Sequence, residues 1–158
     1  MKKQLIRIGI KIGIVAVLVA GLLLFVVTVR VQHSNNMYPA MRDGQLCLFV
    51  KPAEPILDQV VLYKDPAGIE RVGRIVAQSG DGVEIADNSV IVNENTLYNT
   101  VPFPVPPGSV SYPYSVKPGH FFILNDYREQ ETDSRSFGAV PRENIIGVLF
   151  FTMQYRGF

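Results

Sequence analysis

The stretch HFFILNDYREQETDSRSFGAVP, residues 120–141, opens with the short apolar run Phe121–Leu124. The turn pair Pro118-Gly119 precedes this run, and polar and charged residues follow it. Short runs rich in Val, Ile, Leu and Phe that lie between turn residues are typical of β-strands. The sequence therefore predicts a strand at Phe121–Leu124.

The same pattern recurs on both sides of this stretch. Six further apolar runs, most of them bounded by turn residues, predict strands at Leu46–Val50, Gln59–Tyr63, Gly73–Gln78, Val83–Ile85, Val90–Val92 and Ile145–Thr152. Many short strands at this spacing favour an all-β barrel or sandwich. Outside the N-terminal apolar run described below, no long apolar repeat of the helical period appears.

The segment from Asn99 to Tyr114 is rich in proline. Proline has no backbone N–H and fixes φ, so this segment cannot be a central strand. We expect an extended flap at the edge of a sheet. Two interpretations stay open, namely a solvent loop without a task or a wall over a peptide groove.

An uncharged run of 18 residues, Ile12–Val29, lies near the N-terminus. At about 1.5 Å per residue it nearly crosses a hydrocarbon core of about 30 Å. It exceeds the apolar core of a cleaved secretory signal, and no small-residue cleavage site follows, so an uncleaved anchor is favoured. Four preceding basic residues predict a cytoplasmic N-terminus. We divide the chain into a cytoplasmic basic N-terminus (1–11), a transmembrane anchor (12–30) and an extracellular β domain (31–158).

The composition of residues 31–158 narrows the class of function. They hold ten of the 15 basic residues and all 14 acidic ones, so this part of the chain is mildly acidic. Nucleic-acid binding favours a basic stripe, so the composition does not suggest a nucleic-acid-binding protein. Cys47 is the only cysteine, so no internal disulfide can form, and its apolar surroundings predict a buried thiol. Because no metal-ligand spacing, phosphate loop or cofactor motif occurs, we expect no metal and no cofactor.

Three spaced blocks connect the chain to a known family. They are SNNMYPAMRDG at 34–44, RIVAQSGD at 74–81, and a third block with Asp126, Arg128, Asp133, Ser134, Arg135 and Gly138. Their order, spacing and position resemble the type I signal peptidases, membrane-bound Ser/Lys endopeptidases of the S26 family that remove signal sequences. The resemblance covers essentially the whole chain. It implies coiled antiparallel sheets after one N-terminal transmembrane helix.

Three catalytic positions of that family are changed here. The nucleophilic Ser before Met corresponds to Asn36, the general-base Lys that opens the second block corresponds to Gly73, and a Ser that orients the Lys corresponds to Glu131. Acyl transfer by this route needs a hydroxyl and an adjacent base. An amide nitrogen is a very poor nucleophile and glycine has no side chain. We therefore expect a degenerate homologue that is not an enzyme.

A displaced nucleophile remains the alternative. Ser34 matches the family Ser whose hydroxyl helps form the oxyanion hole, and on an extended chain it faces the same way as Asn36. Ser34 has no recognisable base, because His33 should point away from it and His120 reads as a structural turn residue. Three lysines are further candidates with little to recommend them: Lys51, Lys64 and Lys117. On this alternative the chain is an active signal peptidase that uses Ser34.

Four other matching residues are predicted to be structural. By the resemblance, Asp133 and Arg135 form the salt bridge that ties the core together. Gly80 and Asp81 lie in a Ser-Gly-Asp-Gly sequence that predicts a tight turn with a positive φ at a glycine.

The resemblance also predicts a shallow peptide groove. Its expected lining residues are Val31, Gln32 and Ser34 on one side and Arg71 and Val72 on the other. Strand addition in such a groove needs only backbone donors and acceptors, so it does not depend on the lost residues.

The predicted function is therefore that of a binding protein. The chain resembles in particular the catalytically inactive signal-peptidase-like proteins of streptococcal pilus gene clusters. This implies a membrane-tethered chaperone or scaffold for pilus assembly on a Gram-positive cell surface. Its expected partners are pilin subunits, a sortase, or both. A third interpretation is a non-catalytic subunit that accompanies an active peptidase.

Overall fold

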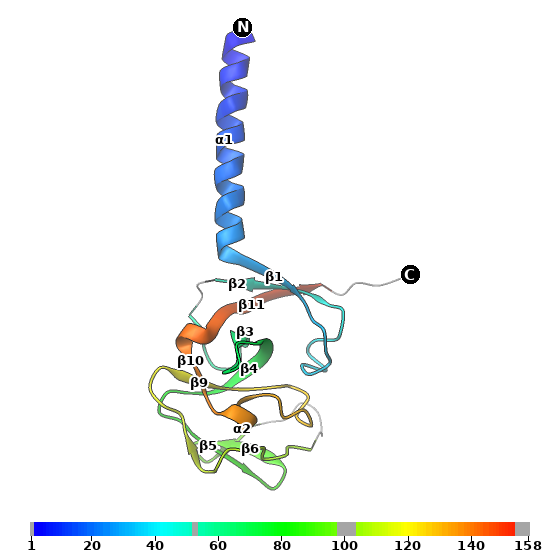
Figure 1. The fold of residues 1–158 in the computed structure, drawn as a ribbon, viewed down its shortest axis with the longest axis vertical. Helices are drawn as coiled ribbons and strands as arrows, with labels where there is room; N and C mark the ends of the chain where they lie inside the picture. Colours follow the sequence, from blue (N-terminus) through cyan, green and yellow to red (C-terminus); the bar gives the residue numbers. More distant parts are fainter. Residues whose placement is uncertain (1, 52–53, 98–103, 154–158) are drawn as a thin grey trace.

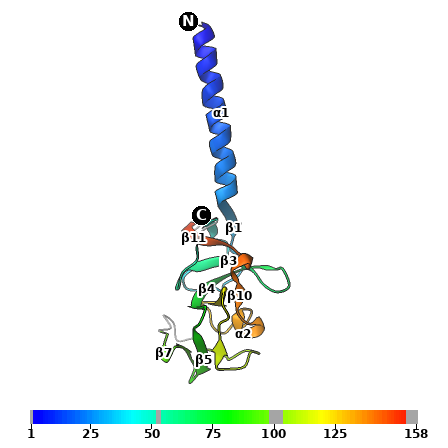
Figure 2. The same ribbon diagram turned by 90° about the vertical axis from the view of Figure 1, so that its left-hand side faces the viewer.

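The computed structural model describes residues 2–51, 54–97 and 104–153. A long N-terminal helix, α1 (Lys2–Val26), projects from a β-rich body (Figure 1). The view from the side shows that α1 continues directly into the first strand of that body (Figure 2). The small sheet lies at the end of the body farthest from α1, so the large sheet is the part next to the helix.

The large sheet has seven antiparallel strands in the order β1-β2-β11-β3-β4-β9-β10. Along the chain these strands are β1 (Val27–Val31), β2 (Leu46–Val50), β3 (Val60–Lys64), β4 (Glu70–Gln78), β9 (His120–Leu124), β10 (Val140–Pro141) and β11 (Ile145–Met153). A short helix α2 (Ser134–Phe137) and a 3-10 turn η1 (Arg142–Asn144) lie between the last three strands. Strand β1 is therefore at one edge of the sheet, and β4 lies inside it.

The small sheet has four strands in the order β7-β6-β5-β8: β5 (Gly82–Ala86), β6 (Ser89–Val92), β7 (Asn95–Thr96) and β8 (Tyr114–Ser115). It follows β4 through a tight turn in which Gly80 has a φ of +90°, a region that favours glycine. The Asp81 carboxylate accepts the backbone N–H of Gln78 at 2.8 Å and the side-chain amide of Asn93 at 2.7 Å. Asp81 thus links the end of β4 to the small sheet.

Buried apolar side chains form three clusters. One joins the small sheet to β4 and β9, with Val83, Val90 and Phe122 fully buried. A second lies among β3, β4, β9 and β11 and contains Tyr63, Ile75 and Ile123. The third joins the loop after β1 to β2, β3 and β4: Met37, Met41, Cys47, Phe49, Val60, Leu62 and Val72. Cys47 is buried, and this burial raises the pKa of its thiol.

The predicted strands are all present. Each of the seven predicted runs coincides with a strand to within a residue or so, except that β4 begins at Glu70 rather than Gly73. The prediction of a mostly β fold with antiparallel sheets is confirmed. Beyond α1, the helices in the described ranges are the four residues of α2 and the three of η1.

The predicted anchor at residues 12–30 differs from the observed elements. Helix α1 ends at Val26, and Val27–Val31 instead form β1, which pairs with β2 from Val27↔Val50 to Val31↔Leu46. Among the described residues, no helix combines the length and apolar character needed to cross a membrane. The transmembrane segment and its orientation therefore stay predictions.

The proline-rich segment packs on Arg135. Residues 99–103 of this predicted flap lie outside the described residues. Beyond them, Pro106 O accepts Arg135 Nη1 at 3.1 Å, and the backbone N–H groups of Ser109 and Val110 donate to Arg135 O. A Cβ at Gly108 would lie 2.5 Å from Arg135 O, so only glycine fits there. The described part therefore packs on Arg135, and its residues are not among those that line the groove described below.

Candidate functional site

Asn36 lies in the loop that leaves β1. Met37 and Met41 in the same loop are 0% and 1% exposed, and Met41 N donates to Met37 O at 2.8 Å. These two methionines pack into the core beneath the loop with Cys47 and Phe49. The apolar anchors therefore fix the loop and hold the half-buried Asn36 against the sheet.

The amide of Asn36 uses all of its hydrogen-bonding capacity within the protein. Its Nδ2 donates to Val72 O and to Asn125 Oδ1, each at 3.0 Å. Its Oδ1 accepts Gln32 Nε2 and Ser34 Oγ, each at 2.5 Å. An amide side chain offers two N–H donors and two lone pairs, so Asn36 is satisfied as a structural link between the loop and β4.

Asn125 is a site residue that the sequence prediction missed. It is 1% exposed, and besides Asn36 it binds Gln130 O through Nδ2 at 3.0 Å and Asp133 through its backbone N–H at 3.0 Å. The spacing of the blocks does not single it out, because its partner Asn36 is 89 residues away in the sequence.

Gly73 is enclosed by core side chains. A Cβ built on it would lie 2.6 Å from Ile123 Cγ2, 3.2 Å from Leu124 O and 3.3 Å from the Tyr63 ring. Tyr63 is fully buried, and this burial raises the pKa of its hydroxyl. Gly73, predicted above to correspond to the family's Lys, therefore has no room for a side chain without repacking.

The other residues considered for catalysis lie in different surroundings: Ser34, His33 and Glu131. Ser34 Oγ donates to Asn36 Oδ1, so the two side chains do face each other. His33, predicted to point away, lines the same groove as Ser34, and that prediction is wrong because β1 ends at Val31 and the strand alternation ends with it. Glu131 makes its described hydrogen bonds within its own loop, to Asp133 and Ser136 through its backbone carbonyl.

A groove of about 280 Å³ runs between the end of β1 and the beginning of β4. The five residues predicted to line a peptide groove, Val31, Gln32, Ser34, Arg71 and Val72, all lie in it. The prediction missed five further lining residues that the structure brings to the same groove: Arg30, His33, Asn36, Leu62 and Glu70.

The walls of this groove are joined by an exposed ion pair. Arg30 on β1 donates to the Glu70 carboxylate on β4 through Nε at 2.8 Å and through Nη2 at 3.3 Å. The hydrogen bond from Arg30 holds the pKa of Glu70 below its ordinary value. The pair thus contributes one charge of each sign to the groove, and these charges compensate each other.

One edge of β4 is open along the groove. Residues 70–74 of β4 pair with β3 on one side, while the ladder with β9 on the other side begins only at Arg74. The carbonyl of Val72 on that side accepts the amide of Asn36. The described part of the chain therefore leaves Glu70–Val72 without a neighbouring strand on this side.

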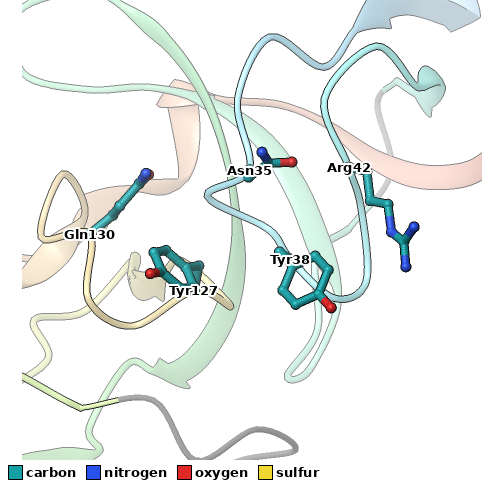
Figure 3. Close-up of a pocket in the computed structure, with 5 residues that line it drawn as sticks. All are labelled: Asn35, Tyr38, Arg42, Tyr127 and Gln130. Carbon is teal, nitrogen blue, oxygen red and sulfur yellow. The ribbon is translucent and has the colours of Figure 1, made fainter.

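A second pocket adjoins the Asn36 loop on its other side. It is lined by Asn35, Tyr38, Arg42, Tyr127 and Gln130, and Figure 3 shows the two tyrosine rings between the loops that carry them. The Arg42 guanidinium lies 5.6 Å from the centre of the Tyr38 ring, within cation–π distance. Tyr127 N donates to Asn36 O at 2.9 Å, so the two loops are joined beside Asn36.

Asp133 and Arg135 form a fully buried ion pair, with 0% exposure of both side chains. Arg135 binds both carboxylate oxygens of Asp133, through Nε at 2.9 Å and Nη2 at 2.7 Å. Its remaining N–H groups reach three carbonyls, those of Pro106, Arg128 and Gln130. The guanidinium therefore holds together α2, the loop before it and the proline-rich segment.

A sequence model described as "Signal peptidase, peptidase S26" matches residues 5–154. The chain belongs to the signal peptidase family. Thylakoidal processing peptidase 1 of Arabidopsis thaliana is 30% identical over 131 residues, which are 72% of this chain and 38% of that protein. Signal peptidase IB of Staphylococcus aureus is 26% identical over 172 residues, covering 96% of this chain and 90% of that protein.

A solved signal peptidase I from Enterococcus faecalis V583 is also similar in structure. Its TM-score is 0.49 at 23% sequence identity, and the match covers 62% of this chain and 98% of that one. The chain spans little more than a third of the length of the two thylakoidal processing peptidases that it matches, 38% and 34%. Membership of the signal peptidase family therefore stands on the sequence match, and activity, substrates and partners are matters of proposal.

Proposed function

We propose that this member of the signal peptidase family binds extended polypeptide segments in the groove between β1 and β4 and does not cleave them. The observation that carries the proposal is the amide of Asn36. It stands where the family has its nucleophilic hydroxyl, and it is hydrogen-bonded to Gln32, Ser34, Val72 and Asn125.

The lack of cleavage follows from the chemistry of these groups. The lone pair of an amide nitrogen is delocalised, and serine-type hydrolysis needs a hydroxyl with a base within hydrogen-bond reach. Gly73 supplies no base, and Ile123 and Tyr63 fill the space beside it. Removing one member of such a catalytic set costs several orders of magnitude in rate, so loss of all members leaves no efficient route.

The capacity to bind peptide rests on backbone groups that do not take part in catalysis. Strand β1 is at the sheet edge, and Glu70–Val72 of β4 has an open side along the same groove. An extended segment can add to such an edge through main-chain hydrogen bonds while pockets contact its side chains. The groove residues named above line the path of that segment.

We further propose that α1 tethers the domain to a membrane. The apolar side chains along its middle are exposed rather than packed on the body, for example Ile12 at 64%, Val17 at 73% and Leu18 at 67%. Four basic residues lie at or before Lys11, a charge distribution that favours a cytoplasmic N-terminus and an extracellular domain. Over its 25 residues α1 is about 37 Å long, and Lys11 can extend its stem toward the membrane surface.

For the partner we propose pilin subunits, a sortase, or both, with this chain as a chaperone or scaffold in pilus assembly. The support is the likeness to inactive signal-peptidase-like proteins of pilus gene clusters together with the three altered catalytic positions, and it is an argument by analogy. A pull-down from native membranes should recover a pilin or a sortase. Recovery of an active peptidase instead would favour the role of an accessory subunit.

An active peptidase is the second candidate, because the similar proteins named above are called peptidases and Ser34 retains a hydroxyl in the groove. The test uses the full-length chain in mild detergent and a fluorescent signal-peptide substrate. We expect binding by fluorescence anisotropy and no cleavage by mass spectrometry. Cleavage that disappears in Ser34→Ala but persists in Ser136→Ala, a serine outside the groove, would overturn the non-catalytic proposal. Absence of binding would overturn the peptide-binding part.

A further inference from the structure

Arg71 is held in place by a buried carboxylate at the turn between β3 and β4. Asp65 is 5% exposed, and its Oδ1 accepts the backbone N–H groups of Ala67 and Ile69, each at 2.9 Å. Its Oδ2 accepts Arg71 Nε at 2.7 Å. Because the turn fixes the carboxylate, the carboxylate in turn fixes the position of the guanidinium.

The outer edge of that guanidinium is unused. Only Nε of Arg71 takes part in a hydrogen bond within the described part of the chain, so its two terminal nitrogens have no protein partner there. Two other arginines differ: Arg30 gives Nε and Nη2 to Glu70, and Arg135 uses every N–H group. Arg71 lines the groove and its side chain is 27% exposed, which leaves it accessible to a ligand.

We propose that Arg71 makes the groove select peptides that present a carboxylate at one position. This inference rests on the proposed peptide-binding function. The planar fork of an arginine matches a carboxylate in a bidentate geometry, and such charge-assisted bonds are stronger than neutral ones. Because Asp65 already orients the fork, little side-chain entropy is lost when a ligand binds. The nearest acid in the groove, Glu70, is already paired with Arg30.

The carboxylate can come from an Asp or Glu side chain or from the C-terminus of a peptide, since both offer the same two oxygens. Its expected place is opposite Arg71, where a segment added along Glu70–Val72 would direct one side chain or its end toward the fork. Leu62 and Val72 supply the apolar part of the groove at that place.

The test measures binding of labelled nonapeptides of alanine and valine to the full-length chain in mild detergent. Five amidated peptides carry one Glu at successive central positions, each matched by a peptide with Gln there. A further pair ends in a free carboxylate or an amide. At one position, or at the C-terminus, we expect the carboxylate to bind about tenfold more tightly than its neutral match. The identity of that pair distinguishes the two sources.

Three protein variants assign the preference to Arg71. Arg71→Gln should abolish it, whereas Arg42→Gln removes the same charge from the neighbouring pocket and should leave it unchanged. Arg71→Lys keeps the charge but not the fork, and should retain only a part of the preference. Because Arg71→Gln also leaves Asp65 without its partner, the comparison of Glu and Gln peptides on the unmodified chain stands independently of any variant.

Each outcome decides the inference. Equal binding of every carboxylate and neutral pair overturns it and leaves the peptide-binding function intact. A preference that survives Arg71→Gln also overturns it, because another group must then be responsible. If no peptide of the set binds at all, both the inference and the proposed function fail.

Discussion

Two polar networks lie next to each other in this fold and differ in charge and burial. The one around Asp133 and Arg135 is ionic and fully buried. The one around Asn36 is built of neutral amides and a hydroxyl and is half-buried. Asn125 belongs to both, since it binds Asp133 through its backbone and Asn36 through its side chain.

The difference indicates which part of the pattern the fold needs. A buried charge is costly unless it is paired and fully hydrogen-bonded, so Asp133 and Arg135 cannot be altered singly without a large penalty. A half-buried neutral polar group can be replaced by another polar side chain, or by apolar packing, if the neighbouring residues adapt. Around Asn36 the amides of Asn36 and Asn125 bind each other, and Ile123 fills the space next to Gly73.

The largest effect should come from removing one partner of the buried pair. Arg135→Met leaves Asp133 charged and buried without its main partner, and should destabilise the fold by about 3–5 kcal/mol. The measurement is urea unfolding followed by circular dichroism. Arg30→Gln is the matched control: its partner Glu70 is exposed to solvent, so the loss should stay below about 1 kcal/mol. Similar losses for the two variants would remove the distinction between the networks.

A smaller loss is expected for a methyl group added at Gly73. Gly73→Ala puts a carbon 2.6 Å from Ile123 Cγ2 and should cost about 1–3 kcal/mol through overpacking. Gly82→Ala is the control, because the nearest atom to its added carbon is 3.9 Å away. In a double-mutant cycle, Gly73→Ala combined with Ile123→Ala should lose less stability than the sum of the two single losses, with a coupling of about 0.5–3 kcal/mol. Strict additivity would show that Ile123 does not fill this space.

Removal of the central amide should have a more modest effect. Asn36→Ala leaves the side chains of Asn125 and Gln32 without one partner each, and should cost about 1–2 kcal/mol in the free energy of unfolding. Asn35→Ala, at the adjacent exposed residue, removes one exposed hydrogen bond, from Asp43 N to Asn35 Oδ1, and should change stability by less than about 1 kcal/mol. An Asn36→Ala variant as stable as the unmodified chain would mean that the amide does not support the loop.

Much of the fold could be predicted because its strands are short apolar runs between turn residues. The end of α1 could not, since the uncharged run continues without a break to Val29, and pairing with Leu46–Val50 makes Val27–Val31 a strand. Local sequence contains no information on such distant partners.

The site shows the same division between local pattern and distant contact. Spacing within the blocks identified Asn36 and Gly73, and the groove residues followed from the resemblance. The contacts that give these positions their meaning join residues far apart in sequence: Asn36 with Asn125, Gly73 with Ile123, and Arg30 with Glu70. These depend on how the strands are ordered, which no single block specifies.

The smallest predicted effect concerns pH and the third carboxylate pair, Asp65 with Arg71, which is less buried than Asp133 with Arg135. Burial alone would raise the pKa of Asp65, but the hydrogen bonds from Arg71, Ile69 and Ala67 outweigh it and lower the pKa. A lowered folded-state pKa gives stability that is complete above the unfolded value, about 3.9, and is lost as the pH falls toward the folded one.

Asp65→Asn removes this contribution and keeps an acceptor for the turn. Urea unfolding between pH 6 and pH 2 (about two units on either side of that value) should therefore show a steeper acid loss for the unmodified chain than for Asp65→Asn. Parallel curves would mean that folding does not favour the charged form of Asp65, and would contradict the role of its contact with Arg71 in orienting that guanidinium.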